Sequence, residues 1–315
     1  MRRWLAMGAL ASAAALWGLM YVVSSVALTT VPALPLVLMR IIISLATLAP
    51  FAIRARFWRV TRRQFWSLAL IGLTGFAGSI SLQFIGTALT SASLASLITS
   101  AAPALIVVFA LFWGERPTAR TLLALGLALA GVALIVGVNI PDGLSLPGAL
   151  ALIGAAITWA LYTVLGRELA RGVSLVNALF WSLLIGGIAI TPLAAPAWPG
   201  LDTMRHYSPA LWLEIIYLSV IAMAFAFWLW NYGFAHLPPD VGAVFGLAQP
   251  LVAVALGVTL LHDRLTPLAA LGGAAIIAAA ALAGLTGGQR RAEAETARAV
   301  HVPPDEGIAM DAVQE

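Results

Sequence analysis

Ten apolar stretches, each long enough to cross a lipid bilayer, follow one another along this chain with only short polar connectors. A helical crossing takes about 20 apolar residues. Water-soluble domains are about 45–50% apolar and about 25% charged, whereas this chain is 62% hydrophobic and 10% charged. The excess apolar surface must face lipid, which predicts an all-α, polytopic membrane protein of ten transmembrane helices. The predicted spans are 4–29, 33–53, 64–87, 91–113, 119–138, 146–166, 174–195, 209–235, 239–261 and 267–287.

The polar residues show no pattern typical of an enzyme. The sequence contains no metal-ligand spacing such as HExxH, no phosphate-binding loop and no cysteine. We therefore expect no catalytic residue, no metal site and no cofactor, and a membrane-embedded enzyme or structural scaffold is the weakest alternative. The net charge of +4 comes from arginines at span ends and does not indicate nucleic-acid binding. The expected partners are a small-molecule substrate and the lipid bilayer.

The arginines indicate how the chain is oriented in the membrane. Basic residues concentrate on the cytoplasmic side of membrane proteins. With both termini in the cytoplasm, 14 of the 17 basic residues lie on that side, Arg205 and Arg264 lie opposite, and Arg40 lies within a span. We expect a multi-pass protein of the bacterial inner membrane, with a disordered cytoplasmic tail at 288–315. The 14 residues are Arg2, Arg3, Arg54, Arg56, Arg59, Arg62, Arg63, Arg116, Arg120, Arg167, Arg171, Arg290, Arg291 and Arg298.

Two stretches of the chain share the same spacing of a glycine and a proline. Gly86 and Pro103 are 17 residues apart, as are Gly233 and Pro250, and the two copies are offset by 147 residues (233 − 86). This repeat predicts two halves, 1–143 and 144–287, of five spans each. Because five is odd, the second half starts on the opposite side of the membrane, so the halves are inverted repeats. Inverted repeats are a recurring design of alternating-access transporters.

Several motifs together resemble the EamA-type transporters of the drug/metabolite transporter superfamily, over about residues 5–287. The second repeat departs from the family pattern, with His262-Asp263 where Gly-Glu is usual. The matching pieces are Leu16-Trp17-Gly18, Pro35 with Arg40, Ala92-Ser93-Leu94-Ala95-Ser96-Leu97 leading to Pro103 and Gly114-Glu115-Arg116, and Gln249-Pro250 leading to Asp263-Arg264-Leu265-Thr266.

The resemblance implies a transporter that exports small metabolites such as amino acids or related amphipathic compounds across the inner membrane. It also implies a central cavity lined by spans 1, 3, 4, 6, 8 and 9, with spans 5 and 10 at the periphery. The same superfamily includes flippases of lipids or lipid-linked precursors, which are the alternative. The substrate, the direction of transport and coupling to protons are left open by the sequence.

Polar and aromatic residues that share helical faces are the candidates for substrate binding. An amide in hydrocarbon needs a partner, so the amides should face the interior. The alternative is a structural core of interhelical hydrogen bonds and packed rings. The candidates are Trp17, Tyr21, Ser24, Ser79, Gln83, Ser96, Thr99, Trp159, Tyr162, Thr163, Trp228, Asn231 and Gln249.

The remaining candidates concern motion and charge. Pro103 and Pro250 remove a backbone hydrogen bond in mid-span, so each either acts as a hinge or only bends its helix. Arg40 either bonds to carbonyls of a neighbouring helix or captures a substrate carboxylate. Glu214 is either a solvated interfacial residue or a proton-coupling site. Small-residue faces on spans 5 and 10 could pack within a protomer or in a homodimer.

Glu115 and Asp263 each precede, by three residues, a threonine that is a predicted helix N-cap, Thr118 or Thr266. An acid near a helix N-terminus meets the positive end of the helix dipole. The expected role of both acids is therefore structural, and a gating ion pair is the alternative.

Overall fold

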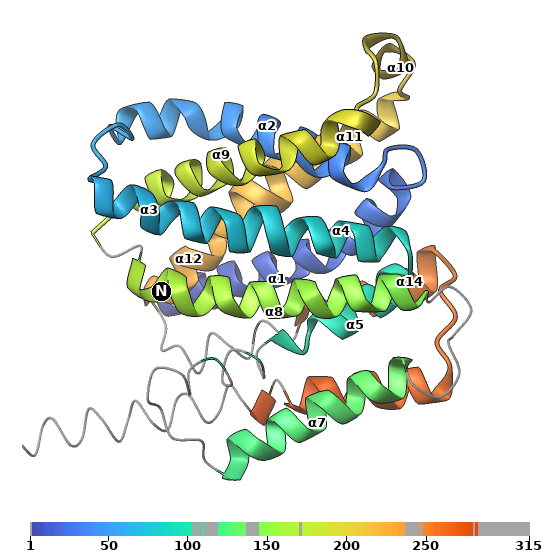
Figure 1. Cartoon of the computed structure of the whole chain (residues 1–315). Coiled ribbons are helices and arrows are strands. Elements are labelled where there is room, and N and C mark those ends of the chain that lie inside the picture. The colour runs from blue at the N-terminus through green and yellow to red at the C-terminus, as the bar shows by residue number, and fades with distance from the viewer. Residues whose placement is uncertain are drawn as a thin grey trace, which may run out of the picture.

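The computed structural model describes residues 2–102, 105, 109, 119–136, 145–169, 172–236, 245, 248–279 and 281–282, and this part of the chain is helical without a β-strand (Figure 1). Six of its helices are long and apolar enough to cross a membrane, and three shorter apolar helices accompany them. The predicted all-α membrane fold is confirmed. Pro103, Glu115, the side chain of Asn231 and the tail 288–315 lie outside the described residues.

Within the described residues, the helices fall where the apolar stretches predict them. Ser91, Ser174 and Ser208 each accept a hydrogen bond from a backbone N–H of the first turn that follows, which ends the connector and starts the helix. The single-segment helices are α1 (Arg2–Ala27), α2 (Ala33–Arg54), α5 (Ala92–Thr99), α7 (Ala119–Val136), α8 (Leu146–Leu169), α9 (Leu175–Ala194), α14 (Ala248–Leu260) and an apolar helix over Pro267–Ala279.

Spans 3 and 8 are both interrupted by a π-helix, in which hydrogen bonds run from residue i to i+5. The two π-helices are nine residues long and begin 145 residues apart (217 − 72), close to the offset of the sequence repeat. Equivalent spans of the two halves therefore share the same irregularity. Span 3 is α3 (Arg62–Ile71), η1 (Gly72–Ile80) and α4 (Ser81–Ala88), and span 8 is α11 (Pro209–Ile216), η3 (Tyr217–Phe225) and α12 (Ala226–His236).

The contacts between the two halves come in matched pairs. Helix α1 packs against α12 and α14, and its counterpart α8 packs against α4 and α5. Helix α2 packs against η3, and its counterpart α9 packs against η1. Two further contacts, α2 with α9 and α5 with α14, join equivalent helices directly. This pattern is that of two inverted repeats that face each other across a pseudo-twofold axis.

Helix α7 and the helix over Pro267–Ala279 lie together at one side of the molecule, at the bottom of Figure 1. A Cβ added at Gly131 would lie 2.6 Å from the carbonyl oxygen of Gly272, and the reverse substitution would meet Gly131 at the same distance. Small residues let these two helices approach closely. The predicted small-residue faces thus pack spans 5 and 10 against each other within the protomer.

Candidate functional site

Three of the predicted binding residues form a polar cluster where α1, α5 and α14 meet. The hydroxyl of Tyr21 lies 2.6 Å from Oγ1 of Thr99 and accepts a longer hydrogen bond, 3.5 Å, from Nε2 of Gln249. Tyr21 is 1% exposed. Because α1 and α5 belong to the first half and α14 to the second, this polar cluster (Tyr21, Thr99 and Gln249) joins the two halves.

An aromatic cluster lies between the halves as well. The ring of Phe227 is 5.1 Å from Trp17, 6.2 Å from Phe76 and 6.3 Å from Trp159, between ring centroids. Trp159 also packs against Tyr162, at 4.9 Å. These five rings come from α1, η1, α8 and α12, and we call them the aromatic cluster.

Two of the five rings, Phe76 and Phe227, were not predicted from the sequence. Trp228 was predicted instead, and the structure places it 52% exposed, in an outward row where it stacks between Phe225 and Tyr232. The prediction for span 8 rested on the clustering of Trp228, Asn231 and Tyr232 on one side of the helix. In the structure Phe227, which is 9% exposed, faces the interior in place of Trp228.

Most of the predicted hydroxyl residues bond to backbone carbonyls. Ser79 donates to Ala155 on the facing helix, and the others bond within their own helices. Gln83 differs, because its Nε2 is buried and has no hydrogen-bond partner in the described part of the chain. A buried amide without a partner costs free energy, so Gln83 is the predicted residue best able to donate to a substrate. The local bonds run from Ser24 to Tyr21, Ser96 to Ser93 and Thr163 to Trp159.

Three side chains of the first half donate to carbonyls of η3. Nε1 of Trp17 bonds to Ala222 at 2.9 Å. Nε of Arg40 bonds to Leu218 at 3.1 Å, and Oγ of Ser44 bonds to Ser219 at 2.8 Å. A π-helix displaces carbonyls from regular bonding, and donors from other helices satisfy them.

Arg40 is 1% exposed, and its guanidinium lies 4.4 Å above the ring of Phe84. Its remaining contact is a weak one to the sulfur of Met20 at 3.5 Å, and Nη1 has no partner among the described residues. The carbonyl and cation–π contacts match the structural interpretation of Arg40. Glu214 is half-buried on α11 and forms no ion pair with a described residue.

A further contact between the halves lies at the membrane side opposite the N-terminus. Oδ2 of Asp263 accepts a hydrogen bond of 2.9 Å from the backbone N–H of Ser93, in the first turn of α5. The backbone N–H of Asp263 bonds to the carbonyl of Gly257 at 3.1 Å, and a Cβ added at Gly257 would lie 2.7 Å from the same carboxylate. We call Ser93, Gly257 and Asp263 the clasp.

The sequence predicts that Asp263 acts at the N-terminus of the helix that follows it, but the structure places its carboxylate at a different helix. Thr266 caps the helix over Pro267–Ala279, as predicted, through a bond from the N–H of Ala269. The carboxylate of Asp263, however, caps α5 in the other half. His262 has a left-handed φ of 58°, which glycine adopts without strain. The matching position of the first repeat is Gly114.

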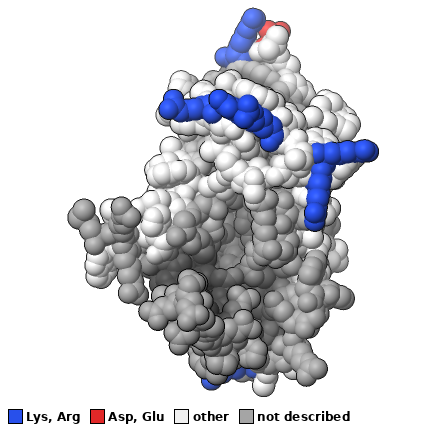
Figure 2. Space-filling view, turned by 90° about the vertical axis from the view of Figure 1, so that its left-hand side faces the viewer, with Lys and Arg blue, Asp and Glu red and all other residues white. Residues whose placement is uncertain are grey.

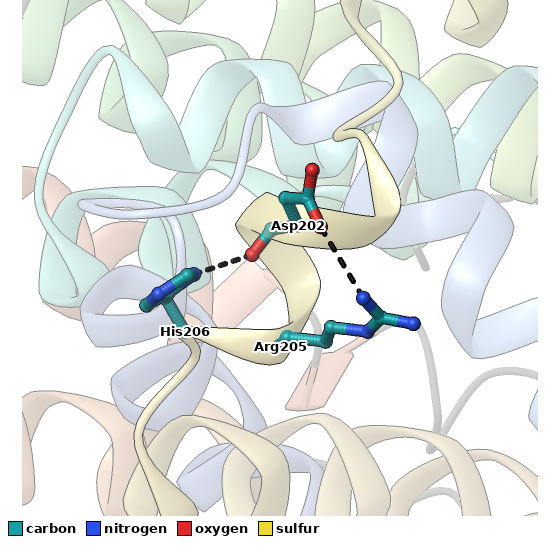
Figure 3. A network of polar contacts seen from close by, with 3 residues as sticks. All are labelled: Asp202, Arg205 and His206. Atoms are coloured by element: carbon teal, nitrogen blue, oxygen red, sulfur yellow. Dashed lines mark hydrogen bonds and ion pairs between the residues drawn. The ribbon is translucent and has the colours of Figure 1, made fainter.

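Other charges at this membrane side are separate from the clasp. Helix α10 (Leu201–Arg205) carries an exposed ion pair in which Nη1 of Arg205 lies 3.4 Å from Oδ1 of Asp202 (Figure 3). Nδ1 of His206 lies 2.6 Å from the carbonyl oxygen of Asp202. Exposed pairs of this kind contribute little to stability, so α10 offers a control for experiments on the clasp.

Pro250 is buried in the first described turn of α14, next to Gln249. Gly18 lets α1 approach α14 at this point, because a Cβ added there would lie 2.7 Å from the carbonyl oxygen of Gln249. A backbone oxygen cannot move away by changing rotamer. The role of Pro250 as a hinge stays a prediction.

We expect Gly18→Ala to force α1 and α14 apart and to lower the stability of the protein by about 1–3 kcal/mol, because overpacking strains a close contact. The measurement is the melting temperature of the detergent-solubilised protein. Gly8→Ala on the same helix is the matched control, since no atom lies within 4 Å of a Cβ built there. Equal losses for both variants would contradict the close approach at Gly18.

Comparisons with known proteins agree with the repeat and the spans. The model of the EamA-like transporter family matches residues 4–137 and again residues 146–285. An uncharacterized transporter of Archaeoglobus fulgidus is 26% identical over 194 residues, which cover 62% of this chain and 67% of that protein. A probable terminal-alkyne amino-acid exporter of Streptantibioticus cattleyicolor is 26% identical over 230 residues, covering 73% and 76%. A solved structure, titled only as the crystal structure of a protein, superposes on this chain with a TM-score of 0.63 and is 24% identical in sequence. The match covers 91% of this chain and 98% of the other.

Proposed function

The chain belongs to the EamA-like transporter family, and on this premise we propose that it exports small amphipathic metabolites, amino acids or related compounds, through a central cavity. One observation carries the proposal. The polar cluster, the aromatic cluster and the unpartnered amide of Gln83 all lie on helices of spans 1, 3, 4, 6, 8 and 9, where the two halves meet. Rings offer a surface to the apolar part of a solute, and the amide and hydroxyl groups bond to its polar part.

Alternating access is the mechanism that an inverted repeat supports. We propose that the halves 1–143 and 144–287 rock against each other about Pro103 and Pro250. The clasp holds them together on the side opposite the termini, which the arginine distribution assigns to the outside of the inner membrane. Ser93 and Thr99 are six residues apart, so the clasp lies about 9 Å along α5 from the polar cluster.

The amino-acid class of the substrate rests on the chemistry of the site and on one relative. The relative from Streptantibioticus cattleyicolor is named as a probable amino-acid exporter. An amino acid presents both a side chain for the aromatic cluster and polar groups for Gln83 and the polar cluster. No carboxylate belongs to either cluster in the described part of the chain, so the proposed transport is facilitated diffusion and does not require Glu214 to carry a proton.

The test is uptake of a labelled panel of amino acids and nucleosides into proteoliposomes, with and without an imposed pH gradient. We expect saturable uptake of amino acids without the gradient. Gln83→Leu, which removes the free donor and keeps the volume, is expected to raise KM about tenfold, since a lost hydrogen bond to a buried partner costs about 1–2 kcal/mol. Gln64→Leu at the α3 cap is the control, because the side chain of Gln64 bonds to Thr61 at the N-terminus of α3 and belongs to neither cluster.

Three outcomes would contradict parts of the proposal. If uptake required the pH gradient, transport would be coupled to protons and Glu214 would be the candidate coupling site. Equal KM values for the protein and Gln83→Leu would remove Gln83 from the site. No uptake of any solute, together with movement of labelled phospholipid between leaflets, would favour the flippase alternative.

A further inference from the structure

The connector between α2 and α3 carries an unusual concentration of positive charge. Arginine occupies five of the ten positions from 54 to 63, which run from the last residue of α2 to the second residue of α3. No acidic residue occurs between 51 and 70, and all five arginines are exposed. In the described part of the chain none of them forms an ion pair. Figure 2 shows several basic side chains on this end of the molecule. We call residues 54–63 the arginine connector; its arginines are Arg54, Arg56, Arg59, Arg62 and Arg63.

The backbone of the arginine connector is held in place by α9, a helix of the other half. Nε1 of Trp181 donates to the carbonyl of Phe57 at 2.8 Å, and Nδ2 of Asn177 donates to the carbonyl of Ala55 at 3.1 Å. The ring of Phe57 packs between Phe180 and Trp181, at 5.0 and 6.0 Å. A fixed backbone lowers the entropy that the arginines lose when they bind a ligand.

Local hydrogen bonds also fix the backbone of the turn between α2 and α3. Arg56 has a left-handed φ of 54°, and its N–H bonds to the carbonyl of Ile53. Thr61 and Gln64 form a capping box, in which each side chain bonds to the backbone of the other residue and starts α3. The arginines are therefore presented on a defined surface at the end of two helices.

Exposed aromatic side chains show where this surface lies relative to the membrane. Phe51, Trp58 and Trp66 are 60%, 57% and 63% exposed, next to the arginines. Tryptophan is enriched at the level of lipid headgroups. At that depth the guanidinium groups meet phosphate, which arginine binds with two parallel hydrogen bonds.

We propose that the arginine connector binds the phosphate headgroups of anionic phospholipids. Its five positive charges without a nearby acid match an anionic ligand, and the flanking rings match the acyl chains of the same molecule. Because α9 of the second half holds a connector of the first half, a lipid bound here contacts the boundary between the halves. The proposal does not depend on which solute is transported.

The test is a lipid titration of the purified protein. Melting temperature is followed by tryptophan fluorescence in neutral detergent micelles that contain increasing fractions of phosphatidylglycerol or phosphatidylcholine. We expect phosphatidylglycerol to raise the melting temperature and phosphatidylcholine to leave it unchanged. Arg59→Gln combined with Arg62→Gln is expected to raise the half-effective fraction of phosphatidylglycerol about 25-fold, since each basic residue near a membrane surface contributes about fivefold in affinity.

The matched control removes two arginines from the opposite membrane side, by Arg205→Gln combined with Arg264→Gln. This control should keep the half-effective fraction of the unaltered protein. Equal weakening in the two double variants would overturn the proposal, because net charge alone would then govern the effect. An equal stabilisation by inorganic phosphate would overturn the assignment to lipid, as would equal stabilisation by phosphatidylcholine.

Discussion

Phe227→Ala is expected to lower the stability of the folded protein by about 2 kcal/mol and to abolish saturable transport. Phe227 contacts rings from three other helices in the aromatic cluster, so its loss leaves a cavity between the halves. In a water-soluble core such a change costs about 3–5 kcal/mol. The effect here is smaller because helices in lipid associate through packing without a hydrophobic driving force. Melting temperature and uptake into proteoliposomes measure the two effects.

Trp228→Ala is the control for Phe227→Ala. Trp228 is the adjacent residue, is larger and is 52% exposed, so its removal should leave uptake unchanged and shift the melting temperature little. If Trp228→Ala abolished transport while Phe227→Ala did not, Trp228 and not Phe227 would belong to the transport site.

Asp263→Ala is expected to open the side of the protein opposite the termini. It removes the charge-assisted hydrogen bond to the N–H of Ser93, which contributes about 1.5–3 kcal/mol. The population open on that side should rise about tenfold or more. The chain has no cysteine, so Ser96→Cys supplies a single reporter on α5, where Ser96 is 0% exposed. The measurement is the rate at which a membrane-impermeant maleimide labels this cysteine in intact cells.

Asp202→Ala is the matched control for the clasp, because Asp202 lies on α10, at the same membrane side, in an exposed ion pair. We expect its labelling rate to equal that of the Ser96→Cys parent. Asp263→Asn keeps an acceptor oxygen and should give an intermediate rate. Equal labelling in the parent and in Asp263→Ala would show that the clasp does not hold the halves together.

Much of the fold is predictable from the sequence because the signals are strong and local. Lipid imposes a length of about 20 apolar residues on each span, and serine caps and prolines mark the connectors. The inward orientation of Tyr21, Thr99 and Gln249 is also predictable, because they are polar residues in hydrocarbon and only the interior offers them partners. Their pairing with one another was not predicted, and Gln83, which has the same need, has no partner among the described residues.

The parts that sequence reasoning missed depend on irregular backbone or on contacts between the halves. No residue in Tyr217–Phe225 marks a π-helix, and nothing in the sequence of α12 indicated that Phe227 and not Trp228 faces the interior. The clasp joins Ser93 to Asp263, which are 170 residues apart (263 − 93). An aspartate just before a capping threonine is expected to act on the helix that follows it. Only the packing of α5 against α14 brings the carboxylate of Asp263 to the N-terminus of α5.

The two π-helices differ in how they are held, although they occupy equivalent places. Carbonyls of η3 are bonded by Trp17, Arg40 and Ser44 from α1 and α2. Among the described residues, η1 is bonded to the other half by fewer such bonds: Oγ of Ser79 donates to the carbonyl of Ala155 on α8, and the contact with α9 runs through glycines, where a Cβ at Gly186 would lie 2.8 Å from Cβ of Phe76. Directional bonds resist sliding along a helix axis more than a contact of small residues does. We therefore expect η3 to resist sliding against the opposite half more strongly than η1 does.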